Sequence, residues 1–196
     1  MLTPVIAERL VSKAKELLES NSSIVLLTHA HPDGDAIGSS LALKNLLEHW
    51  GKKASIVIID KAPESFDFLK GFKDILVVPQ IGKEKTKQIF DEASLICCLD
   101  FNESGRVGKY LQELLTSSQA KRLIIDHHLD INIVGEVTIS CPELSSTSEI
   151  IFRLVWQMGV YPQMDRDFAE DIYCGIVCDT GNFSYGSNSP ELFYIV

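Results

Sequence analysis

Short apolar runs alternate with amphipathic segments along most of this 196-residue chain. Each run is brief and continuously apolar, which is typical of strands that are buried on both faces of a parallel sheet. We expect strands at residues 24–27, 55–59, 75–78, 95–99 and 123–125, with helices at 36–50, 83–93 and 105–116 and a short helical piece around 63–69. This order predicts an α/β fold: a doubly wound, mostly parallel sheet with helices on both faces. A helical C-terminal segment should follow, with helices at 147–158 and 166–178.

Both ends of the chain also carry helix signals. Thr3 and Pro4 suit the cap and first turn of an amphipathic helix that runs to about residue 18. Near the other end, Ser189 and Pro190 have the pattern of a capped helix start, but too few residues follow them for an isolated helix to be stable. We therefore expect residues 1–196 to be one domain, the N-terminal part of a longer two-domain protein.

The most unusual polar cluster directly follows the first expected strand. His29, Asp33 and Asp35 lie within seven residues there, where open parallel sheets place their ligands. We expect Gly34 to let the backbone turn between the two acids and Asp35 to cap the next helix. Capping alone leaves His29 and Asp33 unexplained. Two carboxylates this close repel each other unless a cation lies between them, so the cluster predicts a divalent metal site.

Acids and imidazoles follow other apolar segments in the same way. Asp100 ends the strand at 95–99, and Asp126, His127 and His128 end the strand at 123–125. A further acid, Asp179, closes a later apolar segment. Because the carboxyl ends of parallel strands meet at one edge of a sheet, we expect these side chains to converge on the cluster after the first strand.

Two weaker features lie near the expected helices at 147–158 and 166–178. The run Ser145-Ser146-Thr147-Ser148-Glu149 is interpreted first as a helix N-cap, and the alternative is a phosphate site at a helix N-terminus. Gly175, one turn before Asp179, would let its helix approach the site closely.

The charge balance limits the partners of the protein. Lys and Arg number 18 against 27 Asp and Glu, a formal net charge of −9. Stable binding of duplex DNA needs a basic face, which this balance argues against. A small nucleotide or a short single-stranded oligonucleotide held mainly through metal ions remains compatible with it.

Cysteine usage and hydropathy indicate a cytoplasmic protein. The five Cys include no CxxC pair, and we expect reduced, buried thiols rather than disulfides or a zinc site. No stretch approaches the roughly 20 apolar residues of a membrane span. Charged residues such as Glu8, Arg9 and Lys13 interrupt the first segment, which is therefore not a signal peptide.

Four motifs, taken in order, resemble those of the DHH phosphoesterase superfamily. They are His29-x-x-Pro32-Asp33-x-Asp35-Ala36, Asp100 after its strand, Asp126-His127-His128, and Asp179-Thr180-Gly181-x-Phe183. Within the superfamily, the sequence is most similar to the nanoRNase/pAp-phosphatase group and its cyclic-dinucleotide phosphodiesterase relatives. The form of the last motif favours these over the family II inorganic pyrophosphatases.

The resemblance implies a site for two Mn²⁺ ions. By motif match, one ion would be held by His29, Asp33, Asp100 and Asp179, and the other by Asp35, Asp100, His127 and Asp179, so that Asp100 and Asp179 bridge both. His128 would contact the substrate phosphate, and Asp126 would orient an imidazole from behind. Oxygen ligands with one imidazole per ion suit Mn²⁺ better than metals that prefer thiolates.

The implied function is a manganese-dependent phosphoesterase. It would hydrolyse short oligonucleotides, 3′-phosphoadenosine 5′-phosphate (pAp) or both, through a water activated by the two ions. The alternatives are a cyclic-dinucleotide phosphodiesterase, a RecJ-like single-strand exonuclease, an inorganic pyrophosphatase, or a catalytically incomplete metal- and nucleotide-binding domain. Members of the group carry a second domain with a Gly-rich, His-containing substrate motif, and no Gly-Gly-Gly-His sequence occurs here. The sequence therefore leaves the natural substrate open, and also whether the protein forms a homodimer.

Overall fold

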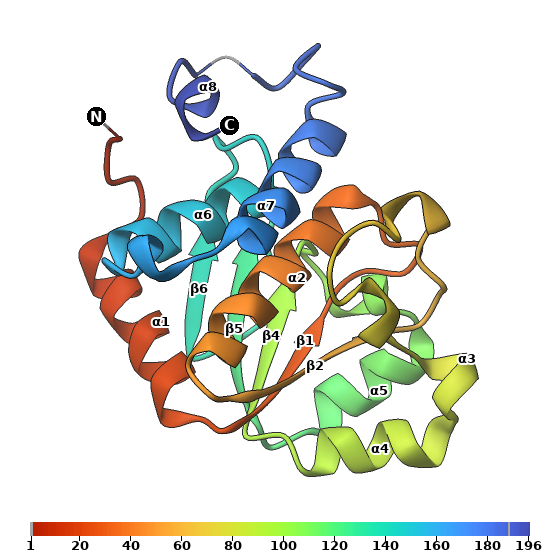
Figure 1. The fold of residues 1–196 in the computed structure, drawn as a ribbon. Helices are drawn as coiled ribbons and strands as arrows, with labels where there is room; N and C mark the ends of the chain where they lie inside the picture. Colours follow the sequence, from red (N-terminus) through yellow and green to blue (C-terminus); the bar gives the residue numbers. More distant parts are fainter. Residues whose placement is uncertain (1, 188) are drawn as a thin grey trace.

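A parallel sheet forms the centre of the molecule. In the computed structural model, which describes residues 2–187 and 189–196, six strands pair in the order β3-β2-β1-β4-β5-β6, all parallel (Figure 1). Their bounds are β1 Ser23–Leu27, β2 Lys53–Ile58, β3 Leu76–Val77, β4 Leu95–Leu99, β5 Lys121–Asp126 and β6 Val137–Ser140. The five expected strands are confirmed, and the sheet is wholly parallel within the described residues.

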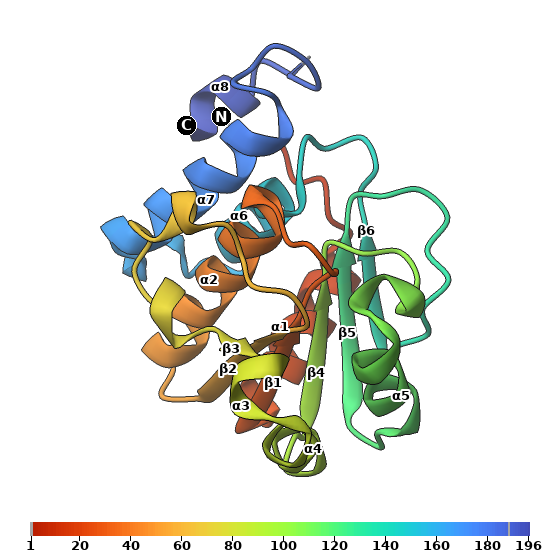
Figure 2. The same ribbon diagram turned by 90° about the vertical axis from the view of Figure 1, so that its right-hand side faces the viewer.

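Helices cover both faces of the sheet, which confirms the doubly wound α/β fold. Helices α1 (Glu8–Ser20), α2 (Gly34–His49), α6 (Thr147–Gln157) and α7 (Arg166–Asp179) lie on one face, and α4 (Lys83–Asp91) and α5 (Lys109–Ser117) on the other (Figure 2). The shorter elements are α3 (Val78–Ile81), α8 (Leu192–Ile195), and the 3₁₀ turns η1 (Glu64–Phe66), η2 (Phe72–Asp74), η3 (Ser104–Val107) and η4 (Tyr161–Gln163).

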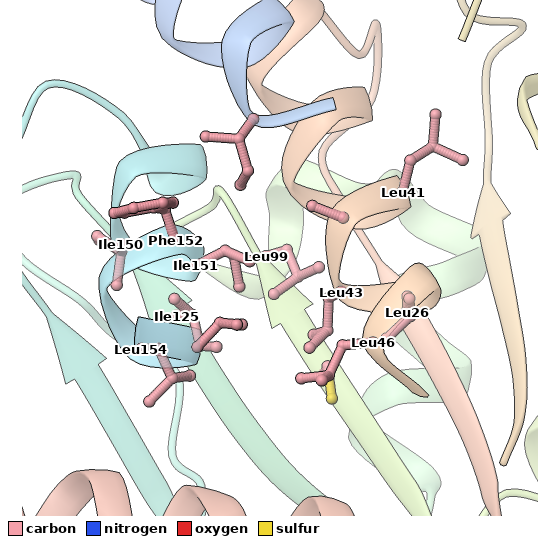
Figure 3. Packing of buried hydrophobic residues seen from close by; sticks show 14 of the residues in the cluster. Leu26, Leu41, Leu43, Leu46, Leu99, Ile125, Ile150, Ile151, Phe152 and Leu154 are labelled. Atoms are coloured by element: carbon pink, nitrogen blue, oxygen red, sulfur yellow. The ribbon is translucent and has the colours of Figure 1, made fainter. Parts of the chain in front are cut away.

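The continuous apolar runs supply two cores, one on each face. In β4, Leu95, Cys97 and Leu99 pack on the side of α2 and α6, while Ile96 and Cys98 pack on the side of α4 and α5. Figure 3 shows the first core, where side chains of α2 and α6 meet those of β1, β4 and β5. A strand buried on both faces needs apolar residues at every position, which explains the pattern of the sequence.

The strand order sets where a ligand can bind. From β1 the chain builds β2 and β3 on one side and then returns to place β4, β5 and β6 on the other. The connections from β1 and β4 therefore diverge, and open sheets of this kind bind their ligands at the carboxyl ends of two such neighbouring strands. The loop that begins at His29 and the residue Asp100 lie at this point.

One strand was not expected from the sequence. Strand β6 forms the edge of the sheet beside β5, with Val137 and Ile139 buried and Thr138 and Ser140 more exposed. Only two of its residues are apolar, so it has no continuous run of the kind that marks the central strands. The expected helices at 147–158 and 166–178 follow it as α6 and α7, so the mostly helical C-terminal segment is confirmed with this one strand added.

Three expected helix bounds also differ. Helix α1 begins at Glu8 rather than at Thr3, whose backbone N–H and hydroxyl instead donate to the Glu191 side chain. The expected helix at 105–116 is divided by Gly108, whose φ of 83° belongs to the left-handed region and separates η3 from α5. At the C-terminus, α8 begins at Leu192, after the expected cap.

The cysteines are free thiols, as expected, but they are not all buried. Cys97, Cys98, Cys141 and Cys174 are buried, whereas Cys178 is exposed near the end of α7. Within the described part of the chain, no helix is both long enough and apolar enough to cross a membrane.

Candidate metal centre

Asp33 is the residue that caps α2. Its Oδ1 accepts hydrogen bonds from the backbone N–H groups of Asp35 at 3.0 Å and Ala36 at 3.1 Å. The expectation that Asp35 is the cap is therefore wrong, and Asp35 lies in the first turn of the helix. The expected sharp turn at Gly34 is also wrong: Gly34 is the first helical residue, and a Cβ there would lie 2.2 Å from Cys178 Sγ. Its lack of a side chain lets α2 and α7 approach each other.

His29 is buried and presents one nitrogen to the acids. Its Nδ1 lies 2.8 Å from its neighbour Ala30's carbonyl oxygen, which can only accept, so the proton is on Nδ1. The lone pair of Nε2 then faces Asp100 Oδ2 at 3.5 Å and Asp33 Oδ1 at 3.9 Å. This tautomer leaves His29 ready to ligate a metal ion.

Asp100 lies between the two halves of the centre. It is buried and has a φ of 64°, an uncommon left-handed conformation for a residue with a side chain. One carboxylate oxygen, Oδ2, faces His29, while Oδ1 lies 3.6 Å from Nε2 of His127. Asp100 is therefore placed to contact two ligands or ions at once.

The second half of the centre is formed by Asp35, His127 and Asp179. The three residues come from α2, from the loop after β5 and from the end of α7. His127 Nε2 lies 3.3 Å from Asp179 Oδ2. Gly175 allows this close approach, as expected, because a Cβ there would lie 1.9 Å from Ser148 Oγ and 2.9 Å from Asp35 Oδ1.

The two predicted catalytic residues form a pair beside this centre. Asp126 is fully buried at the end of β5, and its Oδ1 accepts from His128 Nδ1 at 2.8 Å. This hydrogen bond is the main reason why the pKa of His128 is raised above its usual value. With Nδ1 occupied, Nε2 is the nitrogen of His128 that remains free for a further contact.

Burial and mutual repulsion raise the pKa values of the acids. Burial raises the pKa of Asp35, and it raises the pKa of Asp100 well above its usual value, with further contributions from the charges of Asp35 and Asp33. The pKa of Asp179 rises to about 6, mainly through burial and then through Asp35. A cation among these carboxylates would favour their ionised forms.

The donor set fits divalent metal ions. Among the residues that the structure describes, three groups of side chains offer ligand atoms within 4.8 Å of one another: His29, Asp33 and Asp100; Asp35, His127 and Asp179; and Asp100, His127 and His128. The first two groups match the two expected ligand sets in part, and Asp100 belongs to two groups. Asp179 belongs to one group only, so its bridging role stays a prediction. Carboxylate oxygens with imidazole nitrogens suit Mn²⁺ and similar ions.

Thr147 is a contact of the centre that the sequence did not single out. Its hydroxyl donates to Asp100 Oδ1 at 3.1 Å, and its backbone N–H donates to Asp35 Oδ2 at 2.7 Å. The expected N-cap is confirmed, because Ser146 Oγ accepts from the N–H of Glu149. The anion at this helix N-terminus is the side chain of Asp35. The cluster of small polar residues at 145–148 was the signal in the sequence.

An apolar hollow lies beside α7 and is separate from the predicted metal ligands. A cavity of about 580 Å³ runs along the outer face of α7, and its lining includes Phe66, Tyr161, Tyr173 and Val177. None of the six predicted metal ligands lines this cavity. The predicted metal ligands lie instead at the carboxyl edge of the sheet.

Comparison with known proteins gives relatives for the whole chain. A solved structure of an exopolyphosphatase-related protein from Bacteroides fragilis superposes with a TM-score of 0.95 and 38% identity, covering 99% of this chain and 56% of that one. The bifunctional oligoribonuclease and PAP phosphatase NrnA of Thermus thermophilus is 29% identical over 95% of this chain and 52% of its own length. The cyclic-di-AMP phosphodiesterase PdeA of Listeria monocytogenes is 27% identical over 92% of this chain and 28% of its own length. The chain thus spans about half of its relatives or less.

A more distant likeness concerns the fold alone. A structure of exonuclease RecJ bound to manganese matches with a TM-score of 0.52 at 15% identity.

A model of the DHH family, N-terminal domain, matches residues 23–176, which contain five of the six predicted metal ligands as well as Asp126 and His128. This match covers most of the chain, and the protein therefore belongs to the DHH family.

Proposed function

We propose that this domain is a manganese-dependent phosphoesterase that hydrolyses short oligonucleotides, pAp or both. The observation that carries the proposal is the convergence of two His/Asp groups on Asp100 at the switch point of the sheet. When bound, a pair of divalent ions supplies an activated water and offsets the charge of the phosphoryl oxygens. The similarity to the Thermus oligoribonuclease and PAP phosphatase over 95% of the chain supports this choice of substrates.

We assign the following roles to residues of the chain. His29, Asp33, Asp35, Asp100, His127 and Asp179 would hold the ions. His128, fixed through Nδ1 by Asp126, would donate a hydrogen bond from Nε2 to the substrate phosphate. Positioning of the phosphate supplies a large share of catalysis in such reactions. Because the chain covers 56% of the Bacteroides protein, we also propose that a second domain completes the substrate site.

A cyclic dinucleotide is the second candidate substrate. The similarity to the Listeria cyclic-di-AMP phosphodiesterase extends over 92% of the chain, nearly as far as the similarity to the Thermus enzyme. Each of these substrates is a phosphomonoester or phosphodiester of a nucleoside, and the same group of carboxylates would serve any of them. Parallel assays on pAp, a diribonucleotide and cyclic di-AMP separate the two candidates.

Metal uptake is the first test of the proposal. We expect two Mn²⁺ ions per chain by elemental analysis and a rise in melting temperature with added Mn²⁺, because ions that bind only the folded state stabilise it by mass action. The Asp100→Asn variant, which changes the acid shared by both groups, should lose both effects. Less than one ion per chain with no thermal shift would contradict the metal centre. Hydrolysis assays with Mn²⁺ would then test the substrate.

A further inference from the structure

The N-terminus of α6 contacts two acids that belong to different elements. The backbone N–H groups of Thr147 and Ser148 donate to the two oxygens of Asp35, at 2.7 Å to Oδ2 and 2.8 Å to Oδ1. The hydroxyl of Thr147 donates to Oδ1 of Asp100 at 3.1 Å. All four residues are at least 98% buried. One residue, Thr147, thus binds both carboxylates.

The contacts with Asp35 follow from the geometry of a helix start. The first N–H groups of an α-helix have no partner within the helix and favour an anion. In α6, Ser146 Oγ accepts from Glu149, and the carboxylate of Asp35 takes two of the remaining donors. Each oxygen of Asp35 receives one hydrogen bond and keeps further acceptor capacity for another partner. The two hydrogen bonds therefore orient Asp35 and leave its oxygens able to accept another partner.

The contact with Asp100 depends on a side chain. A hydroxyl carries one proton, and an ionised carboxylate can only accept it, so Thr147 Oγ1 is the donor to Asp100. Among the described residues this is the hydrogen bond that fixes the Asp100 side chain, whose backbone is held at a φ of 64°. The donor therefore decides which way the Asp100 oxygens point.

The first turn of α6 is itself anchored from behind. Glu149 Oε2 accepts from the N–H and hydroxyl of Ser145, at 2.9 and 2.8 Å. Glu149 Oε1 accepts from the buried side chain of Arg153 at 2.8 Å. These bonds hold the helix start rigidly, so that Thr147 presents its donors in a fixed arrangement.

We propose that Thr147 is a positioning residue of the metal centre, which orients Asp35 and Asp100 before an ion arrives. The inference rests on the proposed metal site and adds a residue to it that touches neither metal nor substrate. Partners behind metal ligands typically contribute on the order of ten- to a hundredfold in metal affinity. The loss of the hydroxyl should therefore weaken Mn²⁺ binding by about tenfold.

The substitution Thr147→Val tests the hydroxyl alone. Valine keeps the shape of threonine and keeps the backbone N–H that binds Asp35, but it cannot donate to Asp100. Thr147→Ser restores the donor and should bind Mn²⁺ nearly as the unchanged protein does. Thr147→Ala also lacks the donor and leaves more space, so it replaces the valine variant if that protein does not fold.

Thr86→Val is the matched control. Thr86 is as buried as Thr147, and its hydroxyl donates to the carbonyl of Gly82 at 2.8 Å, on α4 and away from the acids. Removal of a buried hydroxyl should lower the melting temperature of both valine variants. The removal at Thr86 should leave the Mn²⁺ affinity unchanged, because Thr86 does not contact the acids. Affinity is measured by titration calorimetry with Mn²⁺ alone, so no substrate or second domain is needed.

The possible results separate the two proposals. About tenfold weaker binding by Thr147→Val or Thr147→Ala, with normal binding by Thr147→Ser and Thr86→Val, supports the positioning role. Equal binding by the unchanged protein and the hydroxyl-free variants would overturn that role and leave the metal centre intact. Failure of the unchanged protein to bind Mn²⁺ would overturn the metal centre and the positioning role together.

Discussion

The contact between α2 and α7 makes a quantitative prediction at Gly38. Alanine is normally better than glycine inside a helix, by about 1 kcal/mol. At Gly38, however, a Cβ would lie 2.4 Å from the carbonyl oxygen of Asp171 and 3.0 Å from the nitrogen of Gly175. Ordinary contact begins at 3.4 Å, so α7 would have to move by about 1 Å. Both atoms belong to the backbone and cannot rotate away.

The expected cost follows from these distances. Overpacking costs about 1–3 kcal/mol, and a clash with two backbone atoms of α7 belongs at the upper end of that range. Subtracting the gain of about 1 kcal/mol in helix propensity leaves a net loss of about 2 kcal/mol for Gly38→Ala. For a chain of this size, that is a fall in melting temperature of roughly 4–8 °C. Displacement of α7 also moves Asp179 relative to Asp35, so Mn²⁺ binding should weaken.

Thermal melting with and without Mn²⁺ measures both effects. Gly105→Ala is the control, because the atom nearest to a Cβ at Gly105 would be Gln112 Nε2, at 3.9 Å. We expect that variant to melt within a degree or two of the unchanged protein, as surface substitutions usually do. A Gly38→Ala protein that melts at the same or a higher temperature would refute the close-contact argument.

Three further predictions concern single side chains. Burial, and then the charge of Asp167, raise the pKa of Asp171 to about 8. The folded state therefore holds this proton more tightly than the unfolded state, and the stability of the protein should fall as the pH rises from about 4 to about 8. In melting curves over this pH range, Asp171→Asn should show a flatter fall. His128→Ala should keep both Mn²⁺ ions by elemental analysis yet lose hydrolysis, and loss of an ion would show that His128 is a ligand. Thr3 and then Arg153 lower the pKa of Glu191 to about 2, so Glu191→Gln should melt earlier at neutral pH, and the difference should vanish as the pH falls towards 2.

The sheet could be predicted because its central strands are buried on both faces. Strands β1 and β4 consist almost wholly of apolar residues, and β5 contains the unbroken apolar run Leu123–Ile125, a pattern that no helix with one solvated face would have. Strand β6 has one strand neighbour and two polar residues out of four, so it carried no such signal. The helix bounds that were missed depend on backbone angles, as at Gly108, rather than on apolar spacing.

The candidate site could be predicted only as a set of residues at strand ends. Parallel pairing of β1, β4 and β5 brings His29, Asp100 and His127 together, and this follows from strand order. Which of Asp33 and Asp35 caps α2 could not be predicted, because both acids suit an N-cap and only the backbone geometry decides between them. The contact of Thr147 with Asp35 joins residues 112 positions apart, and no local pattern records it.

The structure also refines the argument that converging acids require a cation. Asp33 accepts two N–H groups of α2, and Asp35 accepts two N–H groups of α6, so the start of one helix balances each of these charges in part. Asp100 and Asp179 have less support among the described residues: one hydroxyl donates to Asp100, and an imidazole lies beside Asp179. These two acids are the expected bridging ligands. An ion bound there would therefore relieve the repulsion between carboxylates at the place where the protein itself provides the fewest hydrogen-bond donors. The fold can therefore form around the acids, and the metal would then complete the charge balance at its centre.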